Sequence, residues 1–277
     1  MIVDRSSRGK VRLRGGEAAD FLQGQVTNDV EALAPGQGCY AALLNHKGKM
    51  RLDMRILRGP DWIWIDTEPG AESVLLKTIE TYSLGRDVTW ETAEEGIVSL
   101  IGDGAELDAE PPAEEHSWVA GKHGVYVRTY AGIDVIGHDL PAADATEEEA
   151  ERVRIEHGVP RYGLDMDGDT IPQEAGINDR AVSFSKGCYV GQETVARLHY
   201  KGKPNRHLRG LRLEEPAEHG QPILLGEREV GRVGSACISP TLGPIALAVV
   251  RREASPGDTV QVNGARAEVV ELPFAAH

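Results

Sequence analysis

The sequence predicts an α+β fold that ends in a small domain built of strands, and three features lead to this prediction. Apolar and polar residues alternate with a period of two in several stretches, most clearly over 50–57, as in strands with one buried face. The clearest amphipathic helix, over 69–82, follows several such strands instead of alternating with each of them. Beyond 207, short β-rich runs succeed one another with glycine and proline between them. Few parallel crossovers are therefore expected, which favours α+β over a doubly wound sheet.

The beginning of the chain predicts a strand, a short helix and a hairpin. A strand over 10–13 precedes an interrupted helix, whose apolar side is formed by Ala18, Phe21, Leu22 and Val26. Thr27-Asn28-Asp29 then has the chemistry of a turn or a helix cap. Strands over 39–45 and 50–57 flank the tight turn HKGK and form the hairpin.

The second strand of this hairpin carries charges on one face. A period of two places Arg51, Asp53 and Arg55 together, opposite the apolar residues of the same strand. A solvated face with an ion pair is the simpler interpretation, because surface ion pairs are common and weak. A functional role for these charges is the alternative.

The middle of the chain predicts a sheet, one helix and a further set of strands. Strand 62–66 leads into the helix 69–82, which Pro69-Gly70 opens and whose apolar residues have the spacing of a core-facing helix. Further strands are predicted over 87–91, 97–101, 117–120, 124–130 and 133–136. The stretch 102–116 between them is rich in loop-forming residues.

A second helix begins after Thr146, which forms a capping box with Glu149, and it ends at Gly158 and Pro160. Glu156 lies in its last turn, where an acid is electrostatically unfavourable unless a cation meets it. This placement is a functional hint. The following span, 158–179, consists of turn formers without periodicity, and long loops of this kind are often functional.

The stretch VSFSKGCYVGQETVAR, residues 182–197, combines a strand-like start with an unusual loop. Val182 and Phe184 alternate with serines before two glycines bracket Cys188. Lys186 can favour the thiolate of Cys188 by its positive charge, provided that the two side chains are close. The alternative is a structural cysteine, because free cysteines are usually buried.

Six Lys or Arg residues and no acid occur between Arg197 and Arg212. This basic stripe is either a charged edge strand that avoids aggregation, a contact for an anionic ligand tail, or a contact for nucleic acid. The runs that follow it predict a small barrel or sandwich of about 70 residues.

Composition narrows the classes of function. The chain has 277 residues, which predicts two or three packed modules, and a net charge of −14, which argues against a general nucleic-acid or anionic-membrane binder. Three distant cysteines form neither a zinc motif nor a disulfide framework, so no metal site is predicted and a reducing cytoplasm is expected. No apolar run is long enough for a signal peptide or a membrane span.

The run KGCYVGQE resembles the signature of the YgfZ-type folate-binding proteins, which are relatives of the aminomethyltransferase (T-protein) of the glycine cleavage system. Further blocks resemble the family in the same order: FLQGQVTNDV, LNHKGKMRLD, RIEHGVP, GLDMDGDTIPQE and EVGRVGSACISPTLGPIALAVVR. The resemblance implies two interleaved α+β modules and a C-terminal β-barrel, arranged as a ring around a folate pocket. We therefore expect a folate-binding region over 1–206 and a barrel domain over 207–277.

The resemblance also implies roles for individual residues. Glu156, in RIEHGVP, corresponds to the acid that hydrogen-bonds the pterin, and Asp53 to the catalytic aspartate of T-protein. Arg180 lies near a substrate-binding arginine. Lys186, Cys188, Gln192 and Glu193 match the YgfZ signature, with Lys186 and Cys188 assigned to the chemistry and Gln192 and Glu193 to the cofactor. Asn28, in FLQGQVTNDV, is assigned to the cofactor as well.

These assignments favour a tetrahydrofolate-binding accessory protein that supports iron–sulfur cluster assembly or repair and, indirectly, tRNA modification. Its expected partners are a reduced folate and iron–sulfur client or assembly proteins, without a membrane and without direct contact to nucleic acid. The chain has KGKMRLD where the transferases have a paired-Asp pattern, yet a folate-dependent one-carbon transferase is the alternative. RNA binding through the basic stripe is a third possibility, from a different class.

Overall fold

The computed structural model describes residues 1–102 and 107–274, and these residues form two compact units that are each discontinuous in sequence. The first unit consists of Met1–Glu147 and Asp179–Gln192, and the second unit of Glu148–Asn178 and Glu193–His277. Of the predicted segments, residues 103–106 in the loop 102–116 and residues 275–277 in the last domain lie outside the described residues.

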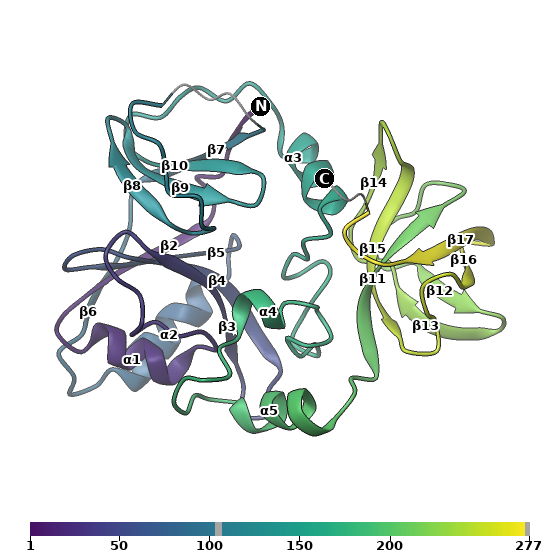
Figure 1. Ribbon diagram of the computed structural model, residues 1–277, viewed down its shortest axis with the longest axis horizontal. Coiled ribbons are helices and arrows are strands. Elements are labelled where there is room, and N and C mark those ends of the chain that lie inside the picture. The colour runs from purple at the N-terminus through teal and green to yellow at the C-terminus, as the bar shows by residue number, and fades with distance from the viewer. Residues whose placement is uncertain (103–106, 275–277) are drawn as a thin grey trace. The chain divides into compact units, whose positions relative to one another are not determined.

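The first unit contains an antiparallel sheet that carries two helices on one face. Its strands, in spatial order, are β3 (Gly38–Leu44), β4 (Met50–Arg58), β5 (Ile63–Thr67), β2 (Gly9–Arg14) and β6 (Thr89–Thr92). The helices α1 (Ala18–Gln25) and α2 (Glu72–Tyr82) cover this face (Figure 1). They bury Phe21, Leu22, Leu75 and Ile79 against apolar side chains of β4. The hairpin and the core-facing helix predicted from the sequence are confirmed.

A second antiparallel sheet lies on the other face of the first. Its strands, in spatial order, are β1 (Ile2–Asp4), β7 (Gly96–Ile101), β10 (Gly132–Gly137), β9 (Gly124–Thr129) and β8 (Trp118–Gly121). Leu57 and Trp64 of the first sheet share a core with Ile97, Val127 and Ile136 of the second. The chain starts in the second sheet, builds the first with β2–β6 and then returns. This order confirms the two interleaved modules that the family resemblance implies.

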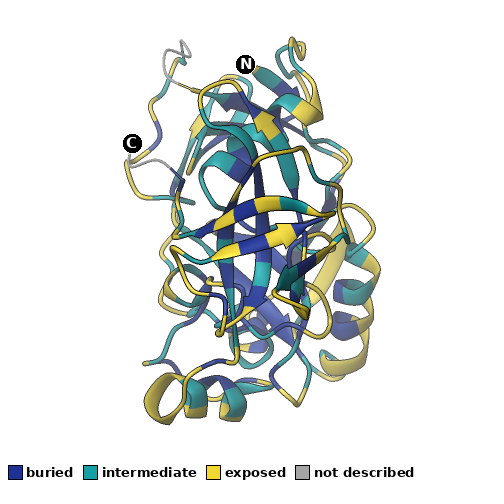
Figure 2. Ribbon diagram, turned by 90° about the vertical axis from the view of Figure 1, so that its right-hand side faces the viewer, coloured by how far each residue is buried: buried dark blue, intermediate teal, exposed yellow. Residues whose placement is uncertain are grey.

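The second unit contains two helices, a long loop and a closed barrel. Helix α3 (Glu147–Glu156) begins beside Thr146 and ends just before Gly158, which has a φ of +68°. The barrel closes through the strands β11 (Arg206–Leu213), β17 (Ala265–Val270), β16 (Thr259–Val262), β12 (Pro222–Leu225), β13 (Arg228–Arg232) and β15 (Gly243–Arg251). A seventh strand, β14 (Ala236–Ser239), pairs with β15 outside this ring. Buried and exposed residues alternate along the strands, as expected for a small barrel (Figure 2). The predicted α+β class with a C-terminal β-barrel is confirmed.

The strand-like alternation at Val182–Phe184 does not form a strand, because this segment pairs in no ladder. It follows the short helix α4 (Asn178–Ala181), and single hydrogen bonds connect it to the turn after α1. Ser183 N donates to Thr27 O at 3.0 Å, and Thr27 Oγ1 donates to Ala181 O at 2.6 Å. Backbone groups that find these partners need no strand neighbour.

The predicted solvated face of strand 50–57 is also wrong. Asp53 and Arg55 are 8% and 6% exposed, because the second sheet covers their side of β4. A β-bulge at Leu43/Leu44 moves Arg51 out of this set. Its Nη1 instead donates to Thr78 Oγ1 of α2 at 3.2 Å.

The basic stripe is not an edge strand. Its residues divide between the helix α5 (Gln192–Lys201) and β11, which pairs with β15 on one side and β17 on the other. Acids elsewhere in the second unit pair with two of its arginines: Arg206 with Glu174 at 2.7 Å and Arg209 with Glu271 at 3.2 Å. The local positive charge is therefore smaller than the sequence suggests.

None of the helices in the described part of the chain combines the length and the apolar character that a membrane crossing requires.

Candidate functional site

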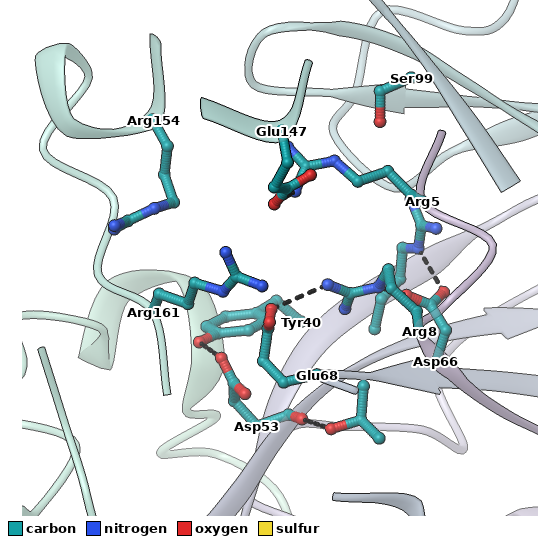
Figure 3. A network of polar contacts seen from close by, with 12 residues as sticks. Arg5, Arg8, Tyr40, Asp53, Asp66, Glu68, Ser99, Glu147, Arg154 and Arg161 are labelled. Carbon is teal, nitrogen blue, oxygen red and sulfur yellow. Dashed lines mark hydrogen bonds and ion pairs between the residues drawn. The ribbon is translucent and has the colours of Figure 1, made fainter. Parts of the chain in front are cut away.

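A buried carboxylate on β4 is the centre of a polar cluster in the first unit. Asp53 Oδ2 accepts a hydrogen bond of 2.6 Å from the Tyr40 hydroxyl on β3 (Figure 3). Burial raises the pKa of Asp53 to about 6, the hydrogen bond from Tyr40 opposes this rise, and the Glu68 carboxylate adds to it. Asp53 can therefore take up or release a proton near neutral pH.

A ladder of ion pairs fixes the strands around Asp53. Arg55 Nε donates to Asp66 at 2.7 Å and its Nη1 to Asp134 of the second sheet at 2.6 Å. Arg8 donates to Asp66 at 2.8 Å and to Glu68 at 2.9 Å (Figure 3). Burial acts to raise the pKa of Asp66, but the two guanidinium groups hold it below its ordinary value. Because these buried charges are paired, the ladder joins the two sheets without an isolated ion.

Three of the predicted site residues lie around Tyr40. The Arg180 guanidinium is 5.3 Å from the Tyr40 ring centroid and pairs with Glu115 at 2.5 Å. Asn28 Nδ2 donates to the carbonyl oxygens of Tyr40 at 2.8 Å and of Arg180 at 3.0 Å. The structure therefore brings Asp53, Arg180 and Asn28 together through a tyrosine that the sequence analysis missed. The hairpin register could have found it, because Tyr40 is paired with Arg55, one step from Asp53 on the same face.

His116 is a second residue of this cluster that the sequence analysis missed. Its ring stacks beside Tyr40 with the centroids 6.5 Å apart, and burial lowers its pKa to about 4. Both ring nitrogens are buried and have no hydrogen-bond partner among the described residues. The imidazole is therefore neutral at pH 7, with a donor and an acceptor still to be satisfied.

Lys186 anchors the signature loop 186–191 on helix α1. Its Nζ donates to the carbonyl oxygens of Gln23 at 2.7 Å, Val26 at 2.8 Å and Asn28 at 2.8 Å. These three bonds use every donor of the ammonium group, at the helix end where a cation is favourable. Burial lowers the pKa of Lys186 to about 8. The influence of its charge on Cys188 stays a prediction.

Two further residues fix the other end of the loop. Tyr189 is buried, and its ring centroid lies 5.1 Å from Lys186 Nζ. Gly191 has a φ of +85°, and a Cβ atom there would lie 2.5 Å from the carbonyl oxygen of Asn45 in the β3–β4 turn. Only glycine fits this close approach.

The anchored loop leaves Cys188 exposed, next to exposed Gly187 and between buried Lys186 and Tyr189. The other two cysteines are half-buried, and burial raises the pKa of Cys39 to about 12 and that of Cys237 to about 11. The alternative of a buried structural cysteine at 188 is therefore wrong. Among the described residues, no group of three or more His, Cys, Asp or Glu side chains is arranged to hold a metal ion.

The remaining predicted residues lie on two helices. Glu156 is in the last turn of α3 in the second unit, is half-buried, and has no hydrogen bond or ion pair within the described residues. Gln192 and Glu193 open α5, where the exposed Glu193 suits the positive end of the helix dipole. Each of the two units therefore contains some of the site residues that were predicted from the sequence.

Comparison with known proteins supports the family that the sequence motifs resemble. Residues 1–106 match the GCVT N-terminal domain, and residues 206–275 match the glycine cleavage T-protein C-terminal barrel domain. The aminomethyltransferase of Rubrobacter xylanophilus is 30% identical, over 99% of this chain and 82% of that protein. The tRNA-modifying protein YgfZ of Colwellia psychrerythraea is 28% identical, over 95% of this chain and 91% of that protein.

The crystal structure of glycine cleavage system aminomethyltransferase T from Bartonella henselae shares the fold, with a TM-score of 0.83 and 19% identity over 99% of this chain and 86% of that one. Taken together, the two matched domains, the relatives and the common fold place the chain in the aminomethyltransferase-like superfamily of the glycine cleavage T-proteins.

Proposed function

We propose that this chain is a tetrahydrofolate-binding accessory protein that supports the assembly or repair of iron–sulfur clusters in other proteins, and through them tRNA modification. The observation that carries this proposal is the exposed Cys188 on a loop whose flanking residues, Lys186 and Tyr189, are buried. Such a loop presents a thiol to a partner protein while its backbone stays in place. One thiol cannot hold a stable cluster alone, so contact with the cluster as cargo would be transient.

The residues present suit a reduced folate. Glu156 has a carboxylate with free acceptors, as the aminopyrimidine edge of a pterin requires, and Arg180 is a cation that is one-third exposed. The unsatisfied His116 nitrogens beside Tyr40 offer a donor and an acceptor to a polar ring. We assign folate contacts to Glu156, Arg180 and Asn28, and to Gln192 and Glu193 at the start of α5. Tetrahydrofolate, when bound, supplies amine nitrogens that can accept a one-carbon group.

Folate binding is tested by calorimetry with the Glu156→Gln variant. This change replaces one acceptor oxygen by a donor and should weaken tetrahydrofolate binding by roughly 1.5–3 kcal/mol, which is about 10- to 150-fold. Glu148→Gln, an exposed acid of the same helix, is the matched control and should bind as the wild type does. Unchanged affinity in Glu156→Gln would remove this residue from the folate site.

The accessory role is tested by complementation in cells that lack the gene, with the activity of an iron–sulfur enzyme as the readout. Cys188→Ala should bind folate normally but fail to restore the enzyme, whereas Cys237→Ala should restore it. Full complementation by Cys188→Ala would refute the proposal.

The second candidate is a folate-dependent aminomethyl transferase, and the state of Asp53 favours it. A buried carboxylate with a pKa of about 6 can hold or accept the proton of a substrate amine. In this case Asp53→Asn should lower the rate of aminomethyl transfer by about 10²- to 10⁴-fold, while Cys188→Ala leaves it unchanged.

A further inference from the structure

The first unit contains a cavity of about 370 Å³ that is separate from the Asp53 cluster. It lies between the two sheets, with Leu57, Trp62 and Trp64 on one side and Val125 and Ile136 on the other. Asp53, Arg55 and Leu57 follow one another on the same face of β4, and Leu57 lines the cavity. The Arg55 ion pairs therefore lie between the cavity and Asp53. None of the residues assigned above to folate lines it.

The indole walls of the cavity are held in place by contacts with neighbouring residues. Trp62 lies flat against Gly59, where a Cβ atom would be 2.1 Å from the indole, and it stacks on Trp118 with the centroids 5.3 Å apart. Trp64 Nε1 donates to Asp66 at 3.1 Å, and the Arg12 guanidinium covers its ring at 5.6 Å. Walls fixed in this way stay in place when the cavity is empty, as in pre-formed ligand sites.

The charges of the lining are unequally paired. Arg12 pairs with Glu95, and His123 Nδ1 lies 3.6 Å from Asp139 Oδ2. Lys122 is exposed and has no ion pair within the described residues, so its ammonium group is available to an acidic group of a ligand.

We propose that this cavity is a second small-molecule site, for a molecule of two aromatic ring systems that bears one acidic group. The volume falls in the usual range for ligand sites, and the indoles favour contact with aromatic ring faces. The acidic group is held by Lys122 at the mouth. The ligand occupies this site independently of folate.

The test uses two fluorescent probes with the same rings, 1-anilinonaphthalene-8-sulfonate and its uncharged analogue N-phenyl-1-naphthylamine, excited by energy transfer from tryptophan. Val125→Trp fills the cavity and should weaken both probes at least tenfold. Lys122→Glu should weaken the sulfonate about threefold or more and leave the neutral probe unchanged. Lys77→Glu, on the exposed side of α2, is the matched control and should change neither.

Saturating tetrahydrofolate should displace neither probe from the wild-type protein. The proposal is overturned if folate displaces the probes, or if a folded Val125→Trp variant binds them as the wild type does. Should Val125→Trp not fold, Lys122→Glu decides alone, because its side chain is exposed: equal loss or no loss of the two probes overturns the assignment. Failure of this test leaves normal folate binding, and hence the proposed function, intact.

Discussion

The Asp53 cluster and the signature loop both bury charge within the first unit, but they neutralise it by different means. Around Asp53, arginines and carboxylates of β4, β5, β10 and the segment before β2 neutralise one another. Lys186 has no ion pair within the described residues and is satisfied by three carbonyl oxygens at the end of α1. The first arrangement leaves a carboxyl group that titrates near neutral pH, whereas the second fixes the backbone of the signature loop. The Asp53 cluster is therefore suited to proton transfer, and the signature loop is suited to presenting a thiol.

The largest effect is expected at Lys186. Lys186→Met removes the cation and leaves three carbonyl groups unsatisfied, which should lower the free energy of unfolding by about 4 kcal/mol. Urea denaturation measures this, and Lys47→Met in the exposed β3–β4 turn should be nearly neutral. A loss below about 1 kcal/mol would show that the loop is anchored by other contacts.

Alkylation of the cysteines gives the next largest effect. At pH 8, pKa values of about 12 and about 11 leave roughly one thiolate in 10⁴ at Cys39 and one in 10³ at Cys237. The exposed Cys188 should therefore react with iodoacetamide at least ~100-fold faster than either, as followed by mass spectrometry. If Cys188 is the slowest of the three, the presentation of its thiol is disproved.

The pH dependence of stability tests the Asp53 cluster. The folded protein binds the Asp53 proton more tightly than the unfolded chain does. The contribution of this proton to the free energy of unfolding is therefore fully present below about pH 4, and it is lost as the pH rises through 6. Asp53→Asn should therefore be about 3 kcal/mol more stable than the wild type at pH 8, with the difference vanishing towards pH 4. Urea denaturation at both pH values measures it, and an Asn variant that is less stable at pH 8 would contradict the assigned pKa.

The smallest effect is expected at Arg180. Its ion pair with Glu115 joins side chains that are 32% and 30% exposed, so Arg180→Gln should lower the free energy of unfolding by only about 0.5–1 kcal/mol. Its effect on tetrahydrofolate affinity should be larger than its effect on stability. The reverse result would make Arg180 a structural part of the cluster.

Local patterns in the sequence predicted those helices and strands whose formation depends on residues close to one another in the chain. Alternation found the β3–β4 hairpin, apolar spacing found α2, and the capping signal at Thr146 found the start of α3. The burial of Asp53 could not be read in this way, because it depends on a second sheet whose strands come from both sides of β2–β6 in the chain. The exposure of Cys188 escaped for a similar reason, since Lys186 finds its partners about 160 residues earlier.

The long separation between Lys186 and α1 has a consequence for biosynthesis. Residues 1–147 leave the ribosome well before Asp179–Gln192, the segment that completes their unit. Until then the carbonyl groups of Gln23, Val26 and Asn28 lack their ammonium partner, and the β3–β4 turn lacks Gly191 against it. Closing a loop of this length is entropically unfavourable and slow. The nascent N-terminal region is therefore expected to depend on chaperones until about two-thirds of the chain has been made.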